Sequence, residues 1–287
     1  MYLWERYATA PWLAANEWRL EEIAPGAVAI ISHPDRARSL VQVACKTEAQ
    51  ASRLMRRFQG STERLPRRWQ ESFLQHDVGP PIRIGKRLLI VANARGTLAA
   101  TKEKQLVIPA AGAFGTGAHA TTAMCLRLLE RTTPTFRNKW KLLDLGSGTG
   151  ILALAACLLG ATGAVGIDND PRAVVIAQKN ARLNEIEGAR FINSDLLKWT
   201  PRTRYEVITA NLFSELLIAA LPIIKRSLKR KGCIILSGIL RDQIDRVVCA
   251  LRATGFSVEK LRRRGRWIAL LAIIGPWSAR SEWNRKL

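Results

Sequence analysis

Three glycines, each separated from the next by one residue, lie between a short apolar segment and a longer one in the middle of the chain. Residues Lys141–Leu145 predict a strand, the glycines are Gly146, Gly148 and Gly150, and Ile151–Leu159 predict a helix. A strand that passes through glycines into a helix is typical of open α/β sheets, in which ligands bind beyond the carboxyl ends of the strands. Because glycine lets the backbone turn tightly and approach a ligand closely, we predict that this loop forms part of a ligand site.

Helical and strand patterns alternate around this loop from residue 120 onward. Predicted helices cover residues 121–130, 151–159, 171–183, 214–228 and 242–254, and predicted strands cover residues 141–145, 164–168, 189–193, 206–210, 232–237 and 267–274. Strands that alternate with helices favour a doubly wound, mostly parallel sheet. The fold class is therefore predicted to be α/β.

The first 110 residues follow a different pattern of short elements. Strands are predicted at residues 27–31 and 40–44 and a helix at 49–58, which indicates a small α+β unit. The turn-rich residues 60–66 predict a linker, and a short helix is predicted at 69–74. Farther along, residues 82–84 and 88–91 predict a hairpin and residues 106–108 another strand. We therefore predict an N-terminal α+β domain over residues 1–62, a linker over residues 63–80 and the α/β domain over residues 81–287.

The chain is strongly basic, with 45 lysines and arginines against 23 acidic residues and a net charge of +22. Such a balance suggests a polyanionic neighbour, most simply RNA. A generally basic, solvated surface explains the same charge, and the sequence leaves both interpretations open. Hydrophobic residues make up 48% of the chain, which is enough for a packed core and argues against wholesale disorder.

The cysteines and the apolar segments bear on the compartment of the protein. Five cysteines without a CxxC pair indicate neither a disulfide framework nor a zinc site, and we predict no metal site. Reduced thiols and an N-terminus without a signal-peptide pattern suit a cytoplasmic protein. The uncharged stretch Leu145–Ile167 is long enough to span a bilayer, but six glycines break it, so a strand, loop, helix and strand explain it better. We expect no membrane span and, by default, a monomer.

The spacing of the glycines discriminates between two kinds of ligand. A dinucleotide fingerprint has the spacing GxGxxG, whereas this loop has GxGxG, with Ile151 where the third glycine would stand. The pattern Asp-x-Gly-x-Gly-x-Gly, which begins at Asp144, is that of class I methyltransferases that use S-adenosylmethionine. A carboxylate such as Asp144 can favour the cationic amino group and the sulfonium of that cofactor. The same spacing disfavours a nicotinamide-dependent dehydrogenase.

Three further acidic residues follow the predicted strands. Asp168 ends the second strand of the α/β region, where a carboxylate can accept hydrogen bonds from both hydroxyls of a ribose. Asp195 follows the third strand, where a carboxylate can accept a hydrogen bond from an adenine amine. Helix capping is the structural alternative for Asp195, and it is the role that we expect for Asp170.

Four segments resemble conserved blocks of one family. Residues Pro109–Thr122 resemble the block PGxAFGTGxHxTT of the ribosomal protein L11 methyltransferases, and residues Asp144–Gly150 resemble the glycine loop of that family. Residues Ala210–Phe213 resemble its Asn-Ile-Leu motif, and residues Leu236–Leu240 resemble its block LSGIL. The resemblance implies a Rossmann-like class I methyltransferase domain and a smaller, ferredoxin-like N-terminal domain that grips the ribosomal protein. It implies S-adenosylmethionine as the cofactor and amino groups of ribosomal protein L11, on lysine side chains and the N-terminus, as the methyl acceptors.

The resemblance also implies which residues contact the cofactor. The cofactor-contacting positions of the family fall on Thr122, Gly146, Asp168 and Asn211. Together with the rest of the glycine loop and the acidic residues after the strands, the expected cofactor-binding residues are Thr122, Asp144, Gly146, Gly148, Gly150, Asp168, Asp195 and Asn211. We expect the side-chain oxygen of Asn211 to accept a hydrogen bond from the incoming amine or from the amino group of the cofactor. Phe114 and Phe213 are expected to wall the pocket or to pack in the core. His119 is a general base or, as is more usual for a lone histidine beside threonines, a structural residue.

Three other functions stay open at this stage. The basic clusters at residues 225–231 and 262–266 favour an RNA methyltransferase, although Asn211-Leu212-Phe213 differs from the Asn/Asp-Pro-Pro-Phe/Tyr motif of enzymes that methylate base amines. A methyltransferase of another protein substrate fits the same cofactor residues. A non-catalytic protein that binds ribosomal particles is the third, and an intact glycine loop argues against it.

Overall fold

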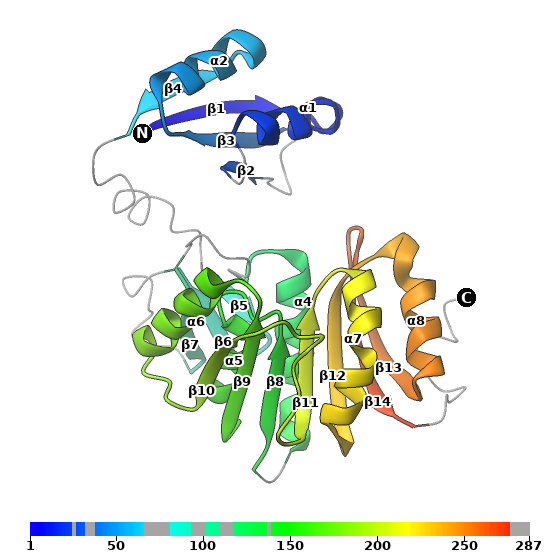
Figure 1. Cartoon of the computed structure of the whole chain (residues 1–287). Helices are drawn as coiled ribbons and strands as arrows, with labels where there is room; N and C mark the ends of the chain where they lie inside the picture. Colours follow the sequence, from blue (N-terminus) through cyan, green and yellow to red (C-terminus); the bar gives the residue numbers. More distant parts are fainter. Residues whose placement is uncertain are drawn as a thin grey trace. The chain divides into compact units, whose positions relative to one another are not determined.

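The computed structural model of the chain describes residues 1–24, 27–31, 38–65, 81–92, 102–109, 117–136 and 139–275. The chain divides into two compact units, Met1–Asp77 and Val78–Leu287 (Figure 1). Phe114 and the predicted helix at residues 69–74 lie outside the described residues.

The N-terminal unit is a four-stranded antiparallel sheet with two helices. Its elements are β1 (Tyr2–Ala8), α1 (Ala10–Ile23), β2 (Val28–Ile31), β3 (Ser39–Cys45), α2 (Glu48–Phe58) and β4 (Ser61–Arg64). The strand order β2-β3-β1-β4 and the βαββαβ connectivity are those of a ferredoxin-like fold, which confirms the prediction for this region. The helix α2 packs on the sheet through Ala51, Leu54 and Phe58, and Thr47 accepts a hydrogen bond from the backbone N–H of Gln50 at its N-terminus.

Sequence patterns missed β1, α1 and β4 in this unit. The prediction of a turn-rich linker is wrong for β4, because Ser61–Arg64 pair with Glu5–Tyr2 of β1. All four residues of β4 are exposed, so the strand has no apolar alternation to reveal it. Its pairing to β1, rather than burial of its side chains, makes it a strand.

The larger unit is built on a seven-stranded mixed sheet, and helices alternate with its strands along the chain, as predicted. Its elements in chain order are α4 (Ala120–Thr132), β8 (Lys141–Leu145), α5 (Ile151–Leu158), β9 (Gly163–Asp168), α6 (Pro171–Leu183), β10 (Ala189–Asn193), β11 (Tyr205–Asn211), α7 (Ser214–Ser227), β12 (Leu228–Leu240), α8 (Ile244–Ala253), β13 (Phe256–Arg264) and β14 (Trp267–Ile274). The strand order is β10-β9-β8-β11-β12-β14-β13. The first five strands are parallel, and β14 is antiparallel to both of its neighbours (Figure 1).

Strand β13 was not predicted. Its residues 259–264 include five charged side chains, and in the described part of the sheet it is the edge strand beside β14. Strand β12 also begins earlier than predicted, through the exposed residues 229–231. Both differences have one cause. Edge strands and strand ends carry polar side chains, so they lack the alternation of apolar and polar residues by which a strand is predicted.

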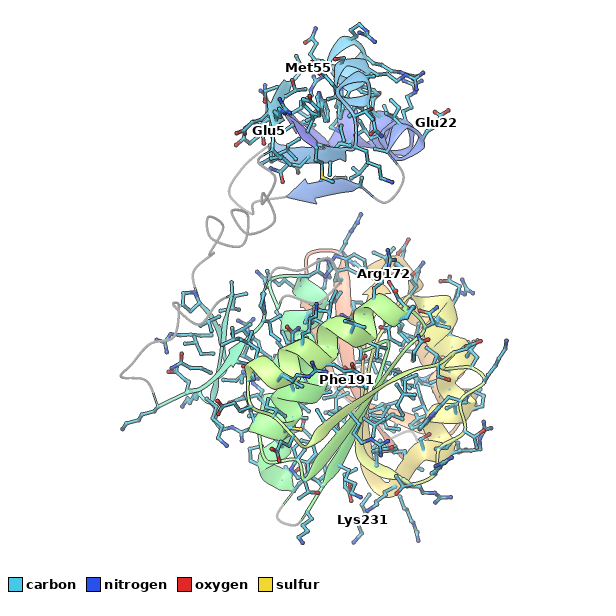
Figure 2. All side chains as sticks on the ribbon, turned by 60° about the vertical axis from the view of Figure 1, so that its left-hand side comes forward. Glu5, Glu22, Met55, Arg172, Phe191 and Lys231 are labelled. Carbon is cyan, nitrogen blue, oxygen red and sulfur yellow. The ribbon has the colours of Figure 1, made fainter. Side chains whose placement is uncertain are left out.

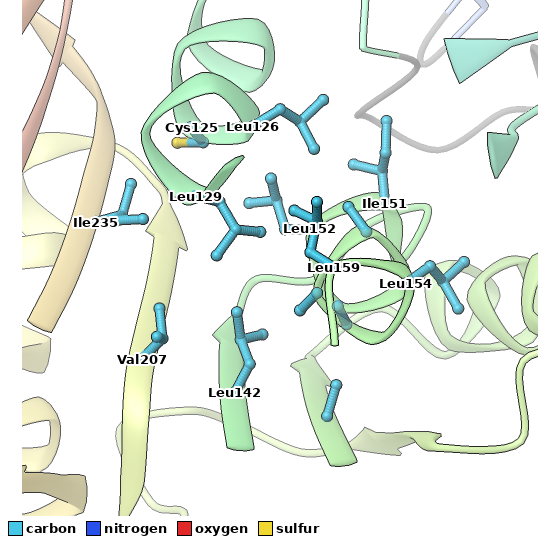
Figure 3. Close-up of a cluster of buried hydrophobic side chains, with 14 of the residues drawn as sticks. Cys125, Leu126, Leu129, Leu142, Ile151, Leu152, Leu154, Leu159, Val207 and Ile235 are labelled. Carbon is cyan, nitrogen blue, oxygen red and sulfur yellow. The ribbon is translucent and has the colours of Figure 1, made fainter. Parts of the chain in front are cut away.

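Alternate side chains of the central strands fill two cores, one on each face of the sheet. Leu142 of β8 belongs to the core beneath α4 and α5, whereas the next residue, Leu143, belongs to the core beneath α7 and α8. Figure 3 shows Leu129 of α4 and Leu152 of α5 in the same cluster as Leu142. The carboxyl ends of the strands are thereby held at one edge by packing on both faces.

A second, three-stranded sheet completes this unit. It consists of β5 (Ile82–Ile84), β6 (Leu88–Val91) and β7 (Lys104–Val107), of which β5 and β6 form the predicted hairpin. The carboxylate of Glu130 on α4 accepts a hydrogen bond from the backbone N–H of Lys86 in the hairpin turn, at 3.1 Å. Within the described residues, no helix combines the length and apolarity that crossing a membrane requires.

Candidate functional site

The glycine loop leaves β8 and turns back over β9. All three glycines have positive φ angles, 72° at Gly146, 52° at Gly148 and 80° at Gly150. The backbone N–H groups of Gly146 and Ser147 both donate to the carbonyl oxygen of Ile167 in β9, at 2.8 and 3.0 Å. These left-handed conformations strain other residues, which explains why the loop needs glycine there.

A cavity of about 440 Å³ opens at the carboxyl ends of the parallel strands. Among the residues singled out from sequence, its lining includes His119, Gly146, Gly148, Asp168, Asp195, Asn211 and Phe213. The structure therefore brings together side chains that are spread over almost a hundred residues of chain. Thr122, Asp144 and Gly150 lie next to this lining and are not part of it.

Asp168 ties the glycine loop to the end of β9. Its Oδ2 accepts a hydrogen bond from the backbone N–H of Gly148 at 2.8 Å, and its Oδ1 accepts one from the backbone N–H of Asp170 at 3.0 Å. Each carboxylate oxygen has a second lone pair, so both oxygens can accept another hydrogen bond from a ligand in the cavity. This geometry suits a vicinal diol such as that of a ribose.

The neighbouring carboxylates have different surroundings. Asp170 is the N-cap of α6, as predicted, and accepts a hydrogen bond from the backbone N–H of Arg172 at 2.9 Å. The Arg172 guanidinium holds the pKa of Asp170 below its ordinary value. Asp195 lines the cavity, accepts a hydrogen bond from the backbone N–H of Leu197 at 2.9 Å and lies 3.8 Å from the Lys198 ammonium.

Asp144 is completely buried beneath the loop. Its Oδ1 accepts a hydrogen bond from the hydroxyl of Thr209 at 2.7 Å, and its Oδ2 has no partner among the described residues. Burial raises the pKa of this carboxyl to about 7, so its charged form is disfavoured. The carboxyl therefore supports the loop from below.

Asn211 ends β11 and lies against the first turn of α4. Its amide nitrogen donates to the hydroxyl oxygens of Thr121 and Thr122, at 3.2 and 3.3 Å. The two threonines fix the side-chain plane and leave the carbonyl oxygen of Asn211 as the atom that can accept a hydrogen bond in the cavity. Thr122 is buried, so it orients Asn211 from outside the lining.

His119 is the N-cap of α4. Its Nδ1 accepts a hydrogen bond from the backbone N–H of Thr121 at 3.4 Å and lies 2.7 Å from the Thr121 hydroxyl. Its ring packs edge-on against Trp267, with centroids 5.3 Å apart. Burial, followed by the charges of Arg266 and Arg264, lowers the pKa of His119 below its ordinary value. These contacts favour the structural interpretation of His119.

Sequence reasoning missed the apolar wall of the cavity. Leu196, Leu212, Leu216 and Trp267 contribute to this wall. Leu212 is wedged between two glycines, because a Cβ at Gly146 would lie 2.3 Å from Leu212 Cδ2 and a Cβ at Gly238 would lie 2.3 Å from the Leu212 carbonyl oxygen. In the sequence, only Gly238 in the block Leu236–Leu240 indicated a close contact at this wall. Phe213, beside Leu212, is 75% exposed and lines the cavity rather than the core.

These residues provide what a nucleoside-containing ligand needs. Asp168 offers two acceptors for a diol, Leu196 and Leu216 offer apolar surface for a flat ring, and Asp195 offers an acceptor for an exocyclic amine. The close glycine backbone leaves room for the ligand beside the strand ends. Within the described ranges, no group of three or more His, Cys, Asp and Glu side chains is arranged to hold a metal ion.

Comparison with known proteins identifies relatives over most of the chain. Residues 15–273 match the family described as ribosomal protein L11 methyltransferase (PrmA). A protein of that name from Heliobacterium modesticaldum is 35% identical over 193 residues, which are 67% of this chain and 60% of that protein. Another, from Desulforapulum autotrophicum, is 43% identical over 162 residues, which are 56% of this chain and 52% of that protein. The chain thus spans little more than half of the length of the curated relatives it matches.

A crystal structure supports the same relationship. The ribosomal protein L11 methylase from Lactobacillus delbrueckii subsp. bulgaricus superimposes with a TM-score of 0.62 at 28% identity, and the match covers 68% of this chain and 98% of that one. The larger unit therefore has the fold that the glycine loop and the alternating elements predicted.

Proposed function

Because the chain belongs to the ribosomal protein L11 methyltransferase family, we propose that it transfers methyl groups from S-adenosylmethionine to amino groups of ribosomal protein L11. The observation that carries this proposal is the convergence of Asp168, the glycine loop and Asn211 on one cavity at the strand ends. The acceptors are lysine side chains and the N-terminal amine.

The cavity offers a separate place for each part of the cofactor. S-adenosylmethionine supplies an activated methyl group on a sulfonium sulfur. Asp168 would accept hydrogen bonds from the ribose hydroxyls, Asp195 would accept one from the adenine amine, and Leu196 and Leu216 would pack against the adenine ring. The backbone of Gly146 and Gly148 would lie beside the remainder of the molecule.

Methyl transfer to an amine needs a neutral nitrogen with a free lone pair. Because a lysine side chain has an ordinary pKa of about 10.4, the site must favour loss of its proton. The apolar wall formed by Leu212 and Trp267 disfavours an ammonium by desolvation. The Oδ1 of Asn211 then accepts a hydrogen bond from the amine N–H and orients the lone pair, which is a positioning contribution. Phe213 covers the aliphatic part of the incoming side chain, and we propose the same role for Phe114.

The N-terminal unit is proposed to recognise the ribosomal protein. Its ferredoxin-like sheet is a compact element with its own core around Trp4, Leu20 and Leu54, and it is separate from the cavity-bearing unit. We also propose that the enzyme acts in the cytoplasm, and its five free cysteines are consistent with a reducing compartment. We propose that the enzyme acts as a monomer.

Methyl transfer from labelled S-adenosylmethionine tests the proposal directly. The enzyme is offered purified L11 and protein-free ribosomal RNA from the same organism, and the expected result is label on L11. Label on RNA alone would replace L11 by RNA as the substrate. Label on neither, with the cofactor still bound, would indicate another protein substrate. Failure to bind the cofactor would leave only a non-catalytic interaction protein.

A further inference from the structure

The hairpin formed by β13 and β14 carries a dense group of arginines at its tip. Arg262, Arg263 and Arg264 end β13, Arg266 lies in the turn, and Arg241 follows β12 next to it. We refer to these five residues as the arginine rim. All five are exposed, and none forms an ion pair with another described residue. Asp242, Asp245 and Glu259 are the acidic residues near this group in sequence, so the arginine rim keeps a positive excess.

The arginine rim lies at the edge of the cavity. Trp267, the first residue of β14, lines the cavity, and the guanidinium carbon of Arg266 lies 5.3 Å from the centre of its ring. The charges of Arg266 and Arg264 add to burial in lowering the pKa of His119, whose ring also packs against Trp267. The hairpin tip in Figure 1 stands at the end of the sheet where the parallel strands finish.

Two of the arginines flank a hollow of their own. A depression of about 450 Å³ is lined by Leu240, Arg241, Asp242 and Arg266. The backbone N–H of Arg241 donates to the carbonyl oxygen of Arg266 at 2.9 Å, which holds the two arginines together. The two guanidinium groups outnumber the one carboxylate, Asp242, at this shallow hollow, and each can contact a phosphate group with two N–H donors.

We propose that the arginine rim is a contact surface for the sugar–phosphate backbone of RNA, so that the enzyme holds RNA next to the cavity in which it methylates a protein amine. The contact is independent of base sequence, because guanidinium groups on an exposed strand read phosphates rather than base edges. This surface goes beyond the methyl-transfer function and does not depend on it.

The chemistry of the rim favours RNA over an acidic protein. Arginine provides all five of its cations, and its planar donor fork pairs with phosphate oxygens more specifically than lysine does. Trp267, which lies beside the Arg266 guanidinium, offers an aromatic surface on which an unpaired base can stack. Carboxylates pair with the same guanidinium fork, but an acidic protein offers no bases for such stacking. A purely protective role of charges on an edge strand is the alternative without a ligand.

A pair of variants with equal charge tests the location. R241Q/R264Q/R266Q removes three cations from the rim. R226Q/R230Q/K231Q removes three exposed cations from the opposite end of the same sheet, where Figure 2 shows Lys231 on the side away from Arg172 and the start of α6. Binding of a fluorescein-labelled oligouridylate is measured by anisotropy over a range of salt concentrations, without cofactor. Thermal unfolding of both variants checks that they fold.

The expected result is a large difference between the two variants. The rim variant is expected to bind about 100-fold more weakly at about 0.1 M salt, with a salt slope about two units shallower, because three phosphate contacts are lost. The control variant is expected to lose less than about threefold. R241K/R264K/R266K, which keeps the charge, is expected to retain most of the salt slope.

Three results would overturn the proposal. Equal losses in the two variants would show that only overall charge matters. Unchanged RNA binding in the rim variant would leave the arginines with a protective role at the sheet edge. Tighter binding of polyglutamate than of the oligouridylate to the parent chain would identify an acidic protein as the partner.

Discussion

Replacement of Asp168 by Asn tests the central assumption about the cavity. The two carboxylate oxygens of Asp168 accept hydrogen bonds from two backbone N–H groups, those of Gly148 and Asp170, at 2.8 and 3.0 Å. Asparagine has one oxygen, so one of these donors would face an amide NH₂ group. Leaving one half-buried donor unsatisfied costs about 1 kcal/mol of folding free energy.

The larger effect is expected on cofactor binding. A ribose hydroxyl that donates to a carboxylate contributes about 1.5–3 kcal/mol, and the variant loses this charge-assisted bond together with the fixed loop geometry. We expect Asp168→Asn to weaken S-adenosylmethionine binding by about 3 kcal/mol, which is about 100-fold in Kd. Isothermal titration calorimetry measures the affinity, and urea unfolding measures the stability.

Asp170 provides the matched control two residues away. Its side chain caps α6 through the backbone N–H of Arg172, and asparagine caps a helix as well as aspartate does. Asp170→Asn should therefore keep the Kd of the parent chain within about twofold, since its exposed ion pair contributes little. If Asp168→Asn binds the cofactor like the parent chain, or if both variants lose affinity equally, the assigned role of Asp168 is refuted.

Three further predictions address the wall, the acceptor and the buried carboxyl. Gly238→Ala should destabilise the fold by about 1–3 kcal/mol more than Gly265→Ala in urea unfolding. Both glycines have a positive φ, but only an alanine at position 238 would bring a Cβ to 2.3 Å from the Leu212 carbonyl oxygen. Equal losses of stability in the two variants would contradict the tight packing of Leu212 between the glycines. Asn211→Ala should lower kcat for L11 by about 100-fold, and full turnover with an unchanged cofactor Kd would exclude a role for its oxygen. The folded-state pKa of Asp144, about 7, lies above the ordinary 3.8, so its contribution to stability is present below pH 3.8 and is lost as the pH rises through about 7. The stability of Asp144→Asn relative to the parent chain should therefore increase from pH 4 to pH 8, and a constant difference in urea midpoints would show that the carboxyl is not held neutral.

Features that depend on a few neighbouring residues follow from local patterns of amino acids. The glycine loop, the cap at Asp170, the hairpin around Gly85 and the alternation of helices and strands were all predictable in this way. Each rests on local rules, such as the freedom of glycine at positive φ or the apolar period of a strand, that operate within one element. The mostly parallel sheet followed from the order of these elements.

Features that depend on partners far away in the chain follow instead from how the elements pack and pair. The exposed strand β4 exists only because it pairs with β1, and β13 only because it pairs with β14. Burial of Asp144, which a local pattern presented as a ligand contact, results from the packing of β8 between β9 and β11. The wedge of Leu212 between Gly146 and Gly238 likewise joins the glycine loop to β12, which follows it much later in the chain. Pattern rules describe one element at a time, whereas burial and strand pairing are set by which elements meet, and this is why the cavity wall could not be read from the sequence.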